Sequence, residues 1–430
     1  MPRGPISGRY SDYVDGGSER RPKKLALGML LVITTATLSF GVLIKKPCVI
    51  QRFGDAFQLC YTDVQYLYHA EELDTGRTPY LDSCSHEKAL CDEYPVVTMF
   101  VMKLVSSVEK TDDGFWFLAV GLLGLAALGT TVLLYRLIGA RALLFALAPA
   151  LFLYAFMSWD LIAVLLVAAA LFAFLKDRPV LCGVLLGIGA ATKLYPALLL
   201  IPLGAELLRR HRFNAARNMV IGSVAAFAII NVPFAATRFH AWSTFFRFNS
   251  TRPADYDSLW YAACRAFHHS TVCPWSSASI NVSSLALFGI GVALVWFLRA
   301  RRDPGFDRTH LVLPMLIVFL LTNKVYSPQF SLWLVPWFAY SLPSVRLYVP
   351  YQLTEVGVFV TRFLWRLRLA KATGGVALAK YTGVSLLTFQ IAILIRSAAL
   401  IACLIAWIAQ PQFPRPEIEP VTTVVEAKAA

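Results

Sequence analysis

The sequence predicts an all-α polytopic membrane protein with about 10–13 transmembrane helices and large extracytoplasmic loops. The chain has 430 residues, of which 57% are hydrophobic, and its mean hydropathy is +0.59. Apolar runs recur along the chain, and basic residues gather in the short connectors between them. Each helix in lipid must satisfy its own backbone hydrogen bonds, so we expect the spans to form one unit.

The net charge of +14 indicates topology and not a nucleic-acid partner. Cytoplasmic connectors of membrane proteins are rich in lysine and arginine. The connectors that follow this rule carry Arg136/Arg141, Lys176/Arg178, Arg209/Arg210/Arg212 and Arg299/Arg301/Arg302.

These anchors assign the elements in order. We expect a basic cytoplasmic tail over residues 1–24, a transmembrane domain over 25–409 with outer loops at about 45–94 and 236–284, and a cytoplasmic tail over 410–430. Around Arg362 and Arg366 the charges conflict with the positive-inside rule. The expected spans are 25–44, 115–135, 142–157, 161–175, 216–235, 285–298, 309–322, 331–342, 347–363 and 383–409, with 95–108 as a short re-entrant segment.

The apolar run 180–208 has basic residues at both ends, so we expect both ends on the same side of the membrane. Each arm then measures roughly 19 Å, against a hydrocarbon core of about 30 Å. The turn falls at Lys193-Leu194-Tyr195-Pro196, where proline removes a helix hydrogen bond. A second lysine turn, Asn323-Lys324-Val325-Tyr326-Ser327-Pro328, follows the run 309–322.

The two lysine turns suggest a site for an anion. A lysine that faces lipid at mid-bilayer costs about 2.5–3.5 kcal/mol, so Lys193 and Lys324 are expected to face a cavity or a charged ligand. A lysine near a helix end can also extend to the membrane surface. Both interpretations stay open on the sequence alone.

Asp63 in the first outer loop is a candidate general base. Thr62 with Gln65 three residues later is a capping-box pattern, which makes Asp63 the first helical residue. The helix dipole favours an ionised carboxylate at that position, and such a carboxylate can accept a proton. The alternative is an acidic residue that only decorates a helix N-terminus.

Six cysteines fall in the predicted outer regions, and this even number suggests disulfides. The nearest pairs are Cys84–Cys91 and Cys264–Cys273. The segment Cys264-x3-His268-His269-x3-Cys273 offers zinc binding as an alternative, but the spacing matches no common zinc ribbon. We therefore expect no metal.

The second outer loop carries Trp260 and Tyr261 among Arg252, Asp255 and Asp257. Aromatic residues at a membrane surface usually anchor helices to headgroups. They can also stack on sugar rings, and an arginine can clamp a phosphate through paired hydrogen bonds.

These segments together resemble glycosyltransferase family 87, whose members are GT-C-type membrane enzymes and include actinobacterial polyprenol-phosphate-mannose-dependent mannosyltransferases. The resemblance runs from about residue 55 to residue 340. The C-terminal 90 residues or so match nothing in the family pattern. The matching segments are Tyr61-Thr62-Asp63-Val64, Gly76-Arg77-Thr78-Pro79-Tyr80, Tyr94-Pro95, Lys193-Leu194-Tyr195-Pro196, Asp257-Ser258-Leu259-Trp260-Tyr261 and Asn323-Lys324-Val325-Tyr326-Ser327-Pro328-Gln329-Phe330.

The resemblance implies a GT-C-type fold and transfer of a sugar, with mannose expected, from a polyprenyl-phosphate donor to a lipid-linked or cell-envelope glycan acceptor. It assigns a multi-pass protein of the plasma membrane with an extracytoplasmic active site, and no cofactor. In this interpretation Asp63 is the base, while Lys193, Lys324 and Arg252 bind the donor phosphate. The residues expected to contact the substrates are Tyr195, Tyr326, Trp260 and Asp257.

Three alternatives remain open. Arabinofuranose is a second candidate for the transferred sugar. A transporter or flippase for an anionic lipid or solute would favour charges near mid-membrane and a two-fold repeat, which the sequence does not display. A non-catalytic assembly factor that retains the fold would not need Asp63.

Overall fold

The computed structural model describes residues 26–50, 60–85, 91–268, 273–342, 344–372, 383–411 and 413. This described part contains seventeen α-helices, four 3-10 helices and no strand. Five helices are long and apolar enough to cross a membrane by length and composition: Leu27–Pro47, Asp112–Ala146, Phe213–Thr237, Ser277–Arg302 and Leu386–Ala409. The predicted all-α polytopic fold is confirmed.

The helices in chain order have the following bounds: α1 Leu27–Ile50, α2 Asp63–Ala70, α3 Val96–Val108, α4 Asp112–Ile138, η2 Gly139–Ala142, α5 Leu143–Ala146, α6 Pro149–Tyr154, α7 Asp160–Leu175, α8 Pro179–Thr192, η3 Tyr195–Leu199, α9 Leu200–Arg209, α10 Phe213–Thr237, α11 Phe239–Thr251, α12 Leu259–His268, α13 Ser277–Arg302, η4 Arg308–Leu311, α14 Val312–Thr322, η5 Pro328–Phe330, α15 Ser331–Ser341, α16 Val345–Ala372 and α17 Leu386–Ala409.

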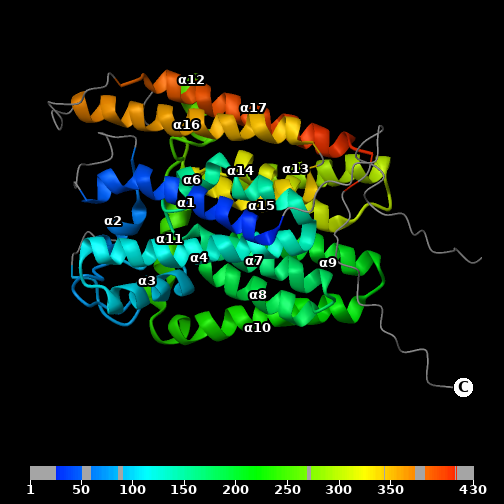
Figure 1. Ribbon diagram of the computed structural model, residues 1–430, viewed down its shortest axis with the longest axis horizontal. Coiled ribbons are helices and arrows are strands. Elements are labelled where there is room, and N and C mark those ends of the chain that lie inside the picture. Colours follow the sequence, from blue (N-terminus) through cyan, green and yellow to red (C-terminus); the bar gives the residue numbers. More distant parts are fainter. Residues whose placement is uncertain are drawn as a thin grey trace, which may run out of the picture.

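The long helices lie side by side in a bundle (Figure 1). α10 packs on α8, α8 on α7, α7 on α4 and α4 on α1, while α16 and α17 form a pair along the opposite edge in this view. The short helices α2 and α3 lie toward the left end of the bundle in Figure 1.

Both predicted lysine turns are confirmed. α8 ends at Thr192, Lys193 has an extended backbone, and the chain continues through η3 into α9. In the same way α14 ends at Thr322, and η5 leads into α15. The hydroxyl of Thr98 in α3 donates to the carbonyl oxygen of Thr192 at 2.7 Å, so the first turn lies beside α3.

The segment 142–157, expected as one span, is not a continuous helix, because it is divided between η2, α5 and α6. Ala148 is extended and Pro149 begins α6, since proline has no N–H to continue the preceding helix. Because of such breaks and of the short loop helices, the seventeen α-helices of the described part are not a count of membrane spans.

α8 and α10 approach each other closely through glycines. A Cβ atom added at Gly183 would lie 1.9 Å from the carbonyl oxygen of Met219, and one at Gly187 would lie 2.3 Å from that of Ser223. Small residues allow membrane helices to pack backbone against backbone, so these two positions fix the α8–α10 contact.

We expect Gly183→Ala to lower the stability of the bundle by about 1–3 kcal/mol, because the added methyl group forces the two backbones apart. Thermal unfolding of the purified protein in detergent measures the loss. Gly121→Ala in α4 is the control, since a Cβ atom there meets nothing within 4 Å. Equal melting temperatures for the two variants would contradict the close-packing argument.

Candidate active site

One cavity of about 600 Å³ contains the principal residues predicted from the sequence. Asp63, Lys193, Lys324 and Arg252 all line it, although they lie as far apart as 261 positions in the chain. Tyr195 lines it as well. We call this space the site cavity.

Asp63 is held in the wall of the site cavity by the backbone on either side of it. The side chain of Thr62 caps α2 by accepting a hydrogen bond from the Val64 amide, as the predicted helix start requires. The amide of Asp63 donates to the Met157 carbonyl oxygen at 2.7 Å. The Tyr61 hydroxyl donates to the Asp63 carboxylate. The carboxylate is therefore fixed relative to the segment that follows α6.

The pKa of Asp63 responds to opposing effects. Burial is the largest and raises the pKa, while the hydrogen bond from Tyr61 and the charges of Lys193 and Arg362 lower it. The result is a pKa above the ordinary aspartate value. A carboxylate with a raised pKa is a better proton acceptor than an exposed one.

Lys193 forms an ion pair that the sequence did not indicate. Its Nζ lies 3.4 Å from Oδ2 of Asp160, a residue with no exposed surface at the start of α7. The indole N–H of Trp333 donates to Oδ1 of Asp160 at 2.7 Å. The Lys193 ammonium also lies over the ring of Tyr94, 4.7 Å from its centroid. The sequence feature that could have identified Asp160 is an acidic residue at the start of an apolar run.

Lys324 has no carboxylate within ion-pair distance among the described residues. Its ammonium donates to the carbonyl oxygen of Ser250 at 3.0 Å, and its own carbonyl accepts from the amide of Asp255 at 2.9 Å. Arg252 lies in the same loop and reaches Asp255 at 3.7 Å. The charge of Lys324 therefore remains available to a ligand.

Glu93 lines the site cavity together with the carboxylates of Asp63 and Asp255. It was not predicted from the sequence. Burial and the charge of Asp63 raise its pKa to about 7, against the lowering effects of Arg252 and Lys193. The amide of Glu93 donates to Glu71, and Glu71 also accepts from the amide of Asp92.

α16 adds Arg362 and Arg366 to the cavity wall. These are the charges that conflicted with the positive-inside rule, and their place in the cavity gives them another role. Arg362 is paired with the carboxylate of Asp257, which has no exposed surface. The Arg366 guanidinium lies over the Tyr61 ring, 5.3 Å from its centroid.

Asp257, Tyr326 and Trp260, predicted to contact substrates, are not among the residues that line the site cavity. Asp257 orients Arg362. The Tyr326 hydroxyl lies 3.2 Å from Oγ of Ser331, and the indole of Trp260 donates to the Thr322 carbonyl at 2.7 Å. Both aromatic residues thus brace the second lysine turn. Val325 and Ser327, the neighbours of Tyr326, line the cavity, whereas no residue of the motif 257–261 does.

Tyr195 does line the site cavity. Its ring stacks on that of Trp333 with centroids 4.2 Å apart. Phe330 stacks on the same indole at 4.0 Å. Three stacked rings from the two lysine turns and α15 therefore form an apolar wall beside the charged one.

The cysteines of the outer segments form disulfides between Cys84 and Cys91 and between Cys264 and Cys273. The second disulfide uses both sulfur atoms that a zinc ion would need. His269, one of the two histidines of that motif, lies outside the described residues.

The lining of the site cavity is suited to an anionic ligand that carries an apolar part. Its described cations outnumber its carboxylates, with Lys193, Arg252, Lys324, Arg362 and Arg366 against Asp63, Glu93 and Asp255. Cations fixed in a partly dry cavity stabilise negative charge more strongly than cations in water. The base candidate Asp63 shares this space with them.

Comparisons with known proteins identify the family of the chain. No curated protein sequence matches the chain. A solved structure similar over 91% of this chain is the Archaeoglobus fulgidus oligosaccharyltransferase in its apo form, with 13% identity and a TM-score of 0.40. The chain spans 57% of the length of that protein. The sequence model of glycosyltransferase family 87 matches residues 93–323, which is more than half of the chain. The chain therefore belongs to glycosyltransferase family 87.

Proposed function

We propose that this protein is an integral-membrane glycosyltransferase that moves a sugar, in the first place mannose, from a polyprenyl-phosphate donor to a lipid-linked or cell-envelope glycan acceptor. The observation that carries the proposal is one cavity lined by a carboxylate, Asp63, and by the cations Lys193, Lys324 and Arg252. We place the reaction at the extracytoplasmic face of the plasma membrane, where the cysteine-containing loops lie in the predicted topology.

In the proposed reaction the acceptor hydroxyl attacks the anomeric carbon directly. Asp63 takes the proton from that hydroxyl as the new carbon–oxygen bond forms. The bond between the anomeric carbon and the phosphate oxygen breaks, and the lipid phosphate leaves with the electron pair. A phosphate is already a good leaving group, so fixed cations that stabilise its charge are sufficient and no proton donor is required.

The chain's own residues divide this work. Lys324, which has no carboxylate partner in the described part of the chain, and Arg252 beside it neutralise the phosphate. Lys193 is shared between Asp160 and the ligand, and so contributes a partly compensated charge. The stacked rings of Tyr195, Trp333 and Phe330 offer an apolar surface for the lipid or the sugar face.

Asp63→Asn is expected to lower the transfer rate by about 10²–10⁴-fold, because an amide cannot accept the proton. Transfer of radiolabelled mannose from a polyprenyl-phosphate donor to a crude lipid acceptor measures this. Asp113→Asn, at the exposed start of α4, removes an equal charge away from the cavity and is expected to retain activity. Full transfer by Asp63→Asn would exclude Asp63 as the base.

Lys324→Gln and Lys193→Gln are expected to differ. Each weakens donor use, with an increase in donor KM of about tenfold for the loss of one charged hydrogen bond. Lys193→Gln also leaves the buried Asp160 carboxylate without its cation, so it lowers the melting temperature as well. Lys176→Gln, in a connector outside the cavity, is the control. Unchanged donor kinetics in both lysine variants would refute phosphate binding by these residues.

Glu93 predicts a pH dependence of donor binding. Its carboxyl is neutral below its pKa of about 7 and negative above it. The donor phosphodiester stays ionised throughout, so we expect donor KM to rise between about pH 6 and pH 8 as the two negative charges repel. Glu93→Gln is expected to remove this rise. A wild-type slope that persists in Glu93→Gln would show that another group titrates.

A further inference from the structure

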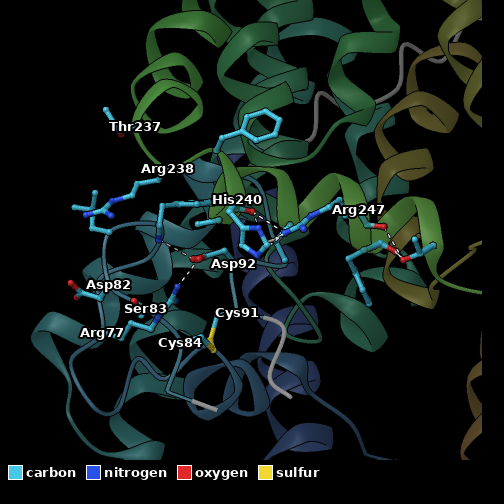
Figure 2. Close-up of a pocket in the computed structure, with 17 residues that line it drawn as sticks. Arg77, Asp82, Ser83, Cys84, Cys91, Asp92, Thr237, Arg238, His240 and Arg247 are labelled. Carbon is cyan, nitrogen blue, oxygen red and sulfur yellow. Dashed lines mark hydrogen bonds and ion pairs between the residues drawn. A yellow bond between two sulfur atoms is a disulfide. The ribbon is translucent and has the colours of Figure 1, made fainter. Parts of the chain in front are cut away.

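A second cavity, larger than the site cavity, opens beside it and has no part in the proposed reaction. Its volume is about 800 Å³. One wall is formed by residues from Thr237, at the end of α10, to Thr251, at the end of α11. The other is formed by residues of the described loop segments 77–84 and 91–92. Figure 2 shows Arg238, His240 and Arg247 along one side and Arg77, Asp82 and the two cysteines along the other. We call this space the second cavity.

α11 separates the two cavities. Thr244, Arg247 and Thr251 line the second cavity, whereas Phe245, Asn249 and Arg252 line the site cavity. Phe248 lines both. This division follows from helical periodicity, because residues three or four apart share a face.

Four consecutive residues of the loop before α3 are divided between the two cavities in the same way. Cys91 and Asp92 line the second cavity, while Glu93 and Tyr94 line the site cavity. α11 and the segment 91–94 therefore contribute to the walls of both spaces.

A disulfide and polar contacts hold the loop wall of the second cavity in place. The disulfide Cys84–Cys91 closes it. Arg77 reaches Asp92 at 2.5 Å, and the amide of Tyr80 donates to the same carboxylate at 3.0 Å. Because the charges of Arg77 and Asp92 compensate each other, neither is free for a ligand.

The uncompensated positive charge of the second cavity lies on the wall formed by α11 and Arg238. Neither Arg238 nor Arg247 has a carboxylate within ion-pair distance among the described residues, and both are exposed. Nη2 of Arg247 lies 3.2 Å from Nε2 of His240, which lies between the two arginines in Figure 2. Asp82 is the remaining carboxylate of the lining, and it accepts the Thr78 amide at 2.7 Å. The balance of the second cavity is positive.

We propose that the second cavity binds a phosphate-bearing ligand other than the sugar donor. Guanidinium groups form paired, charge-assisted hydrogen bonds with phosphate oxygens, and two uncompensated arginines in a cavity of this size offer that chemistry. Thr244, Phe248 and Thr251 continue this lining along α11. The inference does not depend on the proposed glycosyl transfer.

The test uses the full chain in detergent with Lys324→Gln as background, which weakens phosphate binding in the site cavity. Native mass spectrometry measures binding of short-chain phosphatidic acid, and equilibrium dialysis measures binding of radiolabelled glycerol 3-phosphate. Short-chain diacylglycerol serves as the probe without phosphate. Arg238→Gln/Arg247→Gln is compared with Arg178→Gln/Arg217→Gln, which removes two exposed arginines outside the cavity.

We expect Arg238→Gln/Arg247→Gln to weaken phosphate-probe binding by about tenfold or more, and the control pair to leave it unchanged. Arg238→Lys/Arg247→Lys is expected to restore part of the binding, which separates lost charge from a folding defect. Binding of phosphatidic acid alone identifies a lipid headgroup, and binding of glycerol 3-phosphate as well identifies the phosphate group itself. Phosphate-probe binding that is absent, or equal in the glutamine and control pairs, or no stronger than diacylglycerol binding, would overturn the proposal.

Discussion

The buried ion pair between Lys193 and Asp160 is the interaction on which the rest of the site depends. It joins the end of α8 to the start of α7, and the indole of Trp333 brings α15 to the same carboxylate. Removing one partner of a buried pair costs about 3–5 kcal/mol, because the other charge is left without compensation. With both partners present, a lysine can interrupt an apolar bundle and still face the cavity.

A second buried network extends the site into the C-terminal helices. Arg396 of α17 has no exposed surface and donates to the Asp257 carbonyl at 3.1 Å, while Asp257 holds Arg362. Arg396 also lies 3.8 Å from Glu355 of α16, and the Tyr154 hydroxyl donates to Glu355 at 3.1 Å. These helices follow the segment that matches the family model, which ends at residue 323. In this chain α16 therefore lines the candidate site, and α17 supports it through Arg396.

The cavity end of the bundle owes its shape to short elements. α2 presents Asp63, α11 divides two cavities, and the loop before α3 contributes to both of them. These elements are held by specific polar contacts, such as Thr62 to Phe156 at 2.8 Å, and by a disulfide. Short helices have little stability of their own, so their position depends on these tertiary contacts.

The sequence by itself determined the all-α membrane class, both lysine turns, the helix start at Asp63 and the residues Lys193, Lys324 and Arg252 of the cavity. Apart from Arg252, which the family resemblance supplied, these features follow from local rules: hydropathy, the cost of charge in lipid, proline geometry and capping. Only the tertiary structure decided that Asp160 compensates Lys193, that Arg362 and Arg366 line the cavity, and that Tyr326 and Trp260 brace a turn behind it. The physical reason is that a side chain's partner and direction depend on packing between helices distant in sequence, which no local pattern of residues specifies.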